Sequence, residues 1–117
     1  MKREEEGNDE KEKWEEFAGL RWKYVKGLHE LIILGEGPMM NLEKDSDYPW
    51  SIHKNSATTL TIGDGVQSIG PQGFNKFTEL VYVRLPEGLV MIGDRAFFGC
   101  HKLEDFEIPT TLESIGD

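Results

Sequence analysis

The chain has 117 residues, of which 38% are hydrophobic and 30% charged, enough for one small domain with a tail but not for two domains. Thirteen Lys and Arg residues stand against 22 Asp and Glu residues, and the formal charge of -9 disfavours direct binding to nucleic acid or anionic lipid. No apolar run exceeds four residues, so no membrane-spanning helix is expected.

Residues 1–16 form a charged tail. They carry eight acidic and four basic side chains, with Trp14 as the main apolar residue, and such a segment buries too little to order itself. Its second half also has helical features, because Asn8 is a candidate N-cap and Trp14, Phe17 and Ala18 share one helical face. We expect residues 1–16 to be disordered or to form a short helix.

Residues 17–57 are expected to cap the domain, beginning with a β-hairpin. Apolar and basic residues alternate from Leu20 to Tyr24, and a second apolar run, Leu31–Leu34, ends at a glycine-rich turn. A polar loop follows. Pro49 then suits the start of a helical turn, because proline is tolerated at the first helical position.

A repeat with a period of 23 residues occupies the rest of the chain. Its units are residues 58–80, 81–103 and the partial 104–117. Ile69, Ile92 and Ile115 recur at one position, and each is followed by glycine. This period is typical of a leucine-rich solenoid, in which stacked coils bury a continuous ladder of apolar side chains. We expect a mainly β fold with short helical turns, and glycines that turn the chain tightly after each isoleucine.

The repeats resemble the BspA-type leucine-rich repeat family. The second unit carries that pattern in Val83-Arg84-Leu85-Pro86, Leu89, Ile92-Gly93, Ala96-Phe97, Cys100 and Leu103. The first unit departs from it, since Gly63 replaces the proline and Phe77 the cysteine, and the third stops before its Ala-Phe step. The resemblance implies a right-handed solenoid with a parallel sheet and a role in binding other proteins.

The expected location depends on the length of the protein. Met1-Lys2-Arg3 and the acidic run after it lack the apolar segment of a secretory signal, which predicts a cytoplasmic chain. Members of the family are often secreted or surface-bound. A surface or secreted location is therefore expected if the chain is a fragment of a longer member.

Strand alternation predicts a polar outer face on the parallel sheet. If Val81, Val83, Leu85, Phe106 and Ile108 point inward, then Tyr82, Arg84, Asp105 and Glu107 face solvent. Tyr and Arg are enriched among residues that dominate binding energies. The four outward residues are the predicted partner-binding site, although a polar face also serves solubility alone.

The remaining reactive side chains give no catalytic, cofactor or metal site. Cys100 shares its repeat position with Phe77 and is expected in the core, and the three histidines show no ligand spacing. The three tryptophans, Trp14, Trp22 and Trp50, precede the repeats and are expected to pack in the cap rather than in a ligand pocket.

Two functions from different classes follow. The first is a non-enzymatic protein-interaction module whose partner is another protein. The alternative is a small acidic inhibitor that mimics nucleic acid and blocks a basic groove of a nucleic-acid-processing protein. Residues 104–117 suggest it, because they contain five carboxylates and no Lys or Arg. The same segment ends the solenoid without a polar cap. We therefore expect that residues 104–117 form a homodimer, that a different protein covers this end, or that the chain is a fragment of a longer repeat array.

Overall fold

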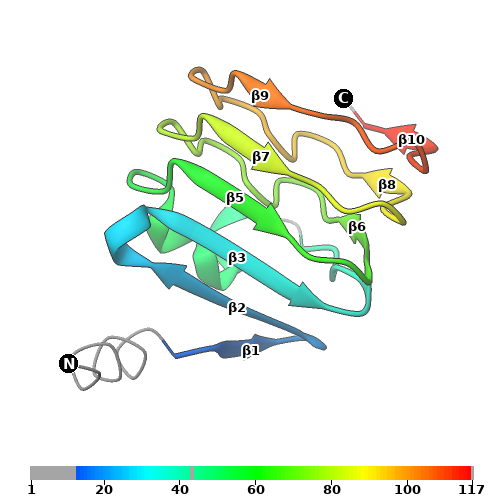
Figure 1. The fold of residues 1–117 in the computed structure, drawn as a ribbon, viewed down its shortest axis with the longest axis horizontal. Helices are drawn as coiled ribbons and strands as arrows, with labels where there is room; N and C mark the ends of the chain where they lie inside the picture. The colour runs from blue at the N-terminus through cyan, green and yellow to red at the C-terminus, as the bar shows by residue number, and fades with distance from the viewer. Residues whose placement is uncertain (1–12, 43, 117) are drawn as a thin grey trace.

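The structure is a computed structural model that describes residues 13–42 and 44–116. Residues 1–12 of the tail predicted over residues 1–16 lie outside these ranges. The chain winds into a short solenoid in which a long sheet and a short sheet form two sides of each coil (Figure 1). Within the described residues, three 3-10 helices lie between the strands, namely η1 (Lys26–Leu28), η2 (Asp45–Asp47) and η3 (Pro49–His53).

The long sheet has six strands in the order β1-β2-β3-β5-β7-β9. They are β1 (Glu15–Phe17), β2 (Leu20–Val25), β3 (Glu30–Gly35), β5 (Thr59–Ile62), β7 (Tyr82–Arg84) and β9 (Asp105–Phe106). The first two junctions are antiparallel and the other three are parallel. The predicted solenoid with an N-terminal hairpin is thereby confirmed.

The short sheet has four parallel strands in the order β10-β8-β6-β4. They are β4 (Gly37–Pro38), β6 (Val66–Ile69), β8 (Met91–Ile92) and β10 (Ser114–Ile115). Ile69 pairs with Ile92, and Ile92 pairs with Ile115, so the sequence period becomes a ladder. Ile69 and Ile92 are buried, whereas Ile115 is 56% exposed because β10 is the edge strand of this sheet.

The segment just before the hairpin differs from the helical expectation. Glu15–Phe17 is strand β1, which pairs antiparallel with β2 through Glu15 opposite Trp22 and Phe17 opposite Leu20. Sheet pairing overrides the helical spacing of these residues, because it gives their backbone groups partners that an isolated short helix could not keep.

Strand β3 belongs both to the hairpin and to the solenoid. It pairs antiparallel with β2 and parallel with β5, where Glu30 lies opposite Thr59 and Ile33 opposite Ile62. The first coil therefore spans 30–58 and is longer than the later coils, which span 59–81 and 82–104. The added length lies between β4 and η3, and it hides this coil from the sequence period.

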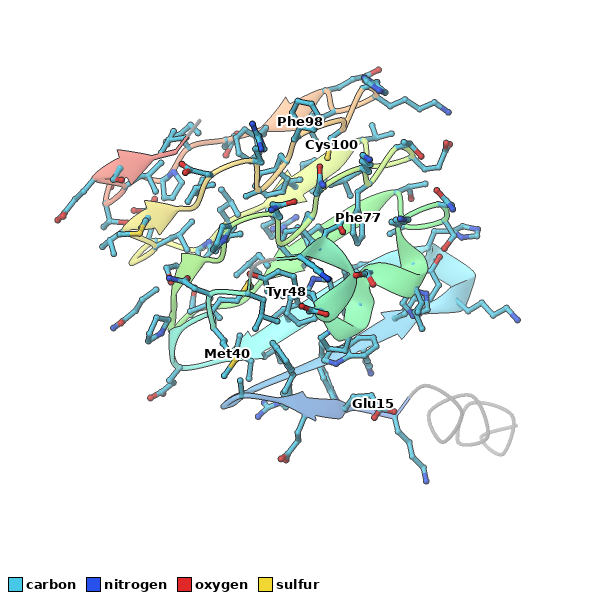
Figure 2. All side chains as sticks on the ribbon, turned by 180° about the vertical axis from the view of Figure 1, so that it is seen from behind. Glu15, Met40, Tyr48, Phe77, Phe98 and Cys100 are labelled. Carbon is cyan, nitrogen blue, oxygen red and sulfur yellow. The ribbon has the colours of Figure 1, made fainter. Side chains whose placement is uncertain are left out.

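Stacked aromatic rings run through the core from coil to coil. Trp50, Phe74 and Phe97 stack in order, with ring centroids 5.7 and 5.6 Å apart. Trp50 Nε1 also donates a hydrogen bond to the Gly73 carbonyl at 2.9 Å. On the side opposite the long sheet, the buried Tyr48 donates to the Pro71 carbonyl at 2.9 Å and so ties the loop to the next coil (Figure 2).

The glycines after the ladder isoleucines have a different role from the one predicted. Gly70, Gly93 and Gly116 do not have positive φ, so a tight turn is not what requires them. A Cβ on Gly93 would lie 2.6 Å from the Pro71 nitrogen and 2.9 Å from the Gly70 carbonyl carbon. The glycines are needed because neighbouring coils approach each other backbone to backbone.

Candidate binding surface

The outer face of the six-stranded sheet carries all four predicted partner-binding residues. Along β7, Val83 is buried, Tyr82 is half-buried and Arg84 is exposed, as strand alternation requires. The same alternation exposes Asp105 in β9 and Glu107 just beyond it. The structure thus gathers the predicted residues on one surface.

Strand register sets the neighbours of Tyr82. It lies opposite Thr59 of β5 on one side and Asp105 of β9 on the other. The guanidinium carbon of Arg84 is 5.6 Å from the centroid of the Tyr82 ring, a cation–π distance. An aromatic ring, a guanidinium and a carboxylate therefore share one small area, a combination able to bind both apolar and charged groups.

The middle of the face is less polar. Ile32 and Leu34 of β3 are half-buried there, and Ile32 lies opposite Thr61 of β5. The Thr61 hydroxyl donates a 2.6 Å hydrogen bond to Glu30 Oε2, which fixes that carboxylate across two strands. This part of the surface offers apolar area framed by an ordered polar pair.

The hairpin end of the face contains a group that sequence reasoning missed. Trp14 is 39% exposed, so the prediction that it packs in the cap is wrong, whereas Trp22 and Trp50 are buried. Its ring contacts Arg21, whose guanidinium carbon is 5.4 Å away, and Lys23, whose ammonium is 4.7 Å away. The basic residues that alternate along β2 were the signal for this group.

Charge is distributed unevenly across the outer face. Arg21 and Lys23 lie on β2 near one edge of the sheet, and Asp105 and Glu107 lie on or beside β9 at the other. Glu16 of the edge strand β1 lies directly opposite Arg21, so the β2 edge carries both signs of charge, whereas Asp105 and Glu107 are both acidic.

Four of the five side chains predicted to point inward are less buried than expected. Val83 is buried, whereas Val81, Leu85 and Phe106 are half-buried and Ile108 is 47% exposed. Strand β9, which ends at Phe106, forms the edge of the long sheet, so within the described residues no further strand covers Ile108.

Cys100 packs against the hydrophobic core. Its Sγ donates toward the Phe74 carbonyl at 3.4 Å, and burial raises the pKa of the thiol to about 11. A thiol with so high a pKa forms little thiolate at neutral pH. These features fit the small apolar role predicted for Cys100.

His53 is held by aromatic neighbours. Its ring stacks on Tyr24 with centroids 4.0 Å apart and makes a T-shaped contact with Trp22, and burial lowers the pKa of the imidazole.

Within residues 13–42 and 44–116, no three His, Cys, Asp or Glu side chains gather closely enough to hold a metal ion. No helix in the same ranges has the length and apolar character needed to cross a bilayer.

Comparison with known proteins agrees with this architecture. A family model described as a BspA type leucine rich repeat region (6 copies) matches residues 51–117. No curated protein gives a significant match to the chain.

Three solved structures resemble the chain. A leucine-rich repeat protein from Eubacterium ventriosum ATCC 27560 has a TM-score of 0.67 and 19% identity, over 85% of this chain and 35% of that chain. A leucine rich repeat protein from T. pallidum has a TM-score of 0.56 and 21% identity, over 89% of this chain and 54% of that chain. A leucine rich cell surface protein from Faecalibacterium prausnitzii A2-165 has a TM-score of 0.53 and 19% identity, over 88% of this chain and 32% of that chain.

The chain thus spans about a third of two of these proteins and about half of the third. At these identities, the likeness shows the fold. The family model covers more than half of the chain and coincides with the stacked coils. The chain therefore belongs to the BspA-type leucine-rich repeat family.

Proposed function

We propose that the chain is a non-enzymatic interaction module that binds another protein through the outer face of its six-stranded sheet. Its membership of a leucine-rich repeat family supports the general role. The observation that carries the proposed site is the Tyr82–Arg84 pair on β7, with Asp105 directly opposite Tyr82 on β9.

The geometry of that pair suits binding. Tyr82 is half-buried and held between two strands, so a partner that packs on its ring orders few additional rotatable bonds. Arg84 is exposed and offers its donors to a carboxylate or carbonyl of the partner. Together they present a rigid aromatic group and a directional cation, the side chains most enriched at binding hot spots.

Affinity capture from the source cell, followed by a titration with the purified partner, tests this proposal. Tyr82→Ala and Arg84→Ala should each weaken binding at least about tenfold, the size expected of a hot spot. Arg95→Ala is the matched control, because Arg95 is exposed and lies outside the long sheet. Equal loss in all three variants, or no loss in the first two, contradicts the proposed surface.

Salt separates this function from the nucleic-acid-mimic alternative. Binding centred on Tyr82 should change little between low and high ionic strength, whereas a mimic held by its carboxylates should lose its partner steeply. No family match or structural relative supports the inhibitor. Capture of a basic nucleic-acid-binding protein that salt releases would favour it.

The compartment of the protein is tested separately. The sequence predicts the cytoplasm for the chain as written, while one structural relative is described as a cell surface protein. Protease treatment of intact source cells distinguishes the two locations, because only a surface protein would be cleaved.

A further inference from the structure

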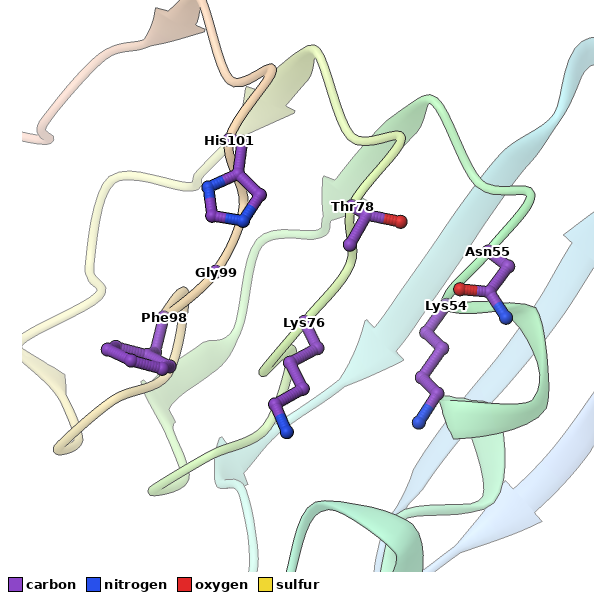
Figure 3. A pocket seen from close by; sticks show the side chains of 7 residues that line it. All are labelled: Lys54, Asn55, Lys76, Thr78, Phe98, Gly99 and His101. Atoms are coloured by element: carbon purple, nitrogen blue, oxygen red, sulfur yellow. The ribbon is translucent and has the colours of Figure 1, made fainter.

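A groove of about 470 Å³ is lined by residues of the turns that connect the strands, not by residues of the six-stranded sheet (Figure 3). Its lining residues are Lys54, Asn55, Lys76, Thr78, Phe98, Gly99 and His101 (Figure 3). The volume falls within the range of about 300–1,000 Å³ typical of ligand sites. Phe98 is 57% exposed at one end, a large apolar side chain left open to solvent.

Three successive coils of the solenoid each contribute residues to this groove. Lys54, Lys76 and Gly99 come from three successive coils, and Thr78 and His101 occupy the same position in successive repeats. The Lys76 amide donates to the Phe98 carbonyl at 2.6 Å, which holds two of the coils together at the groove. The Lys54 and Lys76 side chains extend to the same side (Figure 3). Two ammonium groups are thus presented side by side on a fixed backbone.

The local charge of the groove opposes that of the whole chain. None of its described lining residues is acidic, although the formal charge of the protein is -9. In the described part of the chain, neither Lys54 nor Lys76 forms an ion pair. The acid nearest to Lys76 in sequence, Glu79, is already paired with Lys102 at 2.7 Å, and the hydrogen bond from Lys102 lowers the pKa of Glu79.

We propose that this groove binds an extended acidic peptide segment of another protein. Alternate residues of an extended chain lie about 6.6–6.8 Å apart on one side, a spacing that long lysine side chains on adjacent coils can reach. Carboxylates at positions i and i+2 would pair with Lys54 and Lys76. An aliphatic side chain at i+4 would pack on Phe98, the apolar end of the groove.

A peptide fits this surface better than a nucleic acid does. The groove offers two uncompensated lysines, and a longer polyanion would extend over a surface whose overall charge is -9. Phe98 has room for an aliphatic side chain, although an exposed ring also stacks on bases. A single-stranded oligonucleotide is therefore the competing occupant that the experiment must include.

The test uses the whole chain and a defined probe. A fluorescein-labelled peptide of sequence Glu-Ser-Glu-Ser-Leu, blocked at both ends, is titrated by fluorescence anisotropy, with Gln-Ser-Gln-Ser-Leu as its matched control. The double variant Lys54→Glu/Lys76→Glu should bind the acidic peptide at least about tenfold more weakly, and Phe98→Ala at least about threefold more weakly. Lys13→Glu/Lys44→Glu makes the same change in net charge at two exposed residues outside the groove, so it should change affinity less than about twofold.

Backbone amide NMR shifts locate the peptide and show that each variant is folded. Shifts at Lys76, Thr78 and Gly99 support the groove, whereas shifts confined to Tyr82 and Arg84 would overturn the proposal. Equal binding of the glutamine peptide, equal loss in both double variants, or tighter binding of a short oligothymidine than of the acidic peptide would also overturn it.

Discussion

Replacement of Gly93 by alanine tests how closely the coils are stacked. The added Cβ would lie 2.6 Å from the Pro71 nitrogen and 2.9 Å from the Gly70 carbonyl carbon. Ordinary contacts of this kind are about 3.5 Å or more, so the two coils must separate by about 0.9 Å. The Gly93 amide donates to the Ile69 carbonyl at 2.8 Å, and the same separation would break that hydrogen bond.

The cost of Gly93→Ala combines these two effects. Overpacking costs about 1–3 kcal/mol, and the lost hydrogen bond adds about 1 kcal/mol. We expect the free energy of unfolding to fall by about 2–4 kcal/mol and the Tm by about 8–16 °C.

Urea titration and thermal denaturation followed by circular dichroism measure both quantities. Gly27→Ala is the control, because no heavy atom lies within 4 Å of a Cβ at Gly27 and its φ is not positive. That variant should stay within about 0.5 kcal/mol of the wild-type protein. If Gly93→Ala is equally mild, close backbone approach is not the reason for glycine at this position.

Four further predictions concern the core, two titratable groups and the last repeat. Ile92→Asp buries a carboxylate at a position only 3% exposed and should abolish the cooperative urea transition, so a wild-type transition would contradict the ladder. Burial raises the pKa of Cys100 to about 11, so little reactive thiolate forms in the native protein at pH 8. Cys100 should therefore react with a disulfide reagent at least about tenfold more slowly in the native protein than in guanidinium chloride. Equal rates would contradict its burial. Burial lowers the pKa of His53, so the folded state favours the neutral imidazole. The stability that this preference contributes is complete above pH 6.5 and is lost as the pH falls through the lower pKa of the folded state. Urea titrations at pH 7 and 5 should therefore show a smaller fall in the free energy of unfolding for His53→Gln than for the wild type. A homodimer through residues 104–117 would bring Glu104, Asp105 and Glu107 toward their copies, so light scattering should show it tightening with salt, and a dimer that salt weakens must use another surface.

The regular part of the fold could be predicted because its sequence period equals its structural period. Ile69 and Ile92 occupy the same position in successive repeats and pair directly in the short sheet. The first coil escaped detection because the step from Glu30 in β3 to Thr59 in β5 is longer than the step from Thr59 to Tyr82 in β7. No single offset therefore aligns it with the later coils. Strand β1 was also missed, since Glu15 and Glu16 become part of a strand only through pairing with β2.

One of the two candidate binding surfaces could be predicted from the sequence, and the other could not. Alternation along β7 and β9 was enough to place Tyr82, Arg84 and Asp105 on one face. The groove could not be found by this reasoning, because Lys54 comes from the first coil, which lies outside the period. The alternating basic residues of β2 were a signal for the Trp14 group, but they did not show that the turn at Ala18 and Gly19 folds β1 against β2 and so brings Trp14 to them.

The double pairing of β3 also has a consequence for folding kinetics. Its antiparallel contacts with β2 close over a short stretch of chain, since Val25 lies opposite Glu30, whereas its parallel contacts with β5 close the whole segment between Glu30 and Thr59. Short loops close at a lower entropic cost, so the hairpin should form before any coil. Once formed, it presents a preordered strand edge on which β5, and then β7 and β9, can assemble in turn. The hairpin is thus the template from which the solenoid grows, and destabilising it should slow folding more than it speeds unfolding.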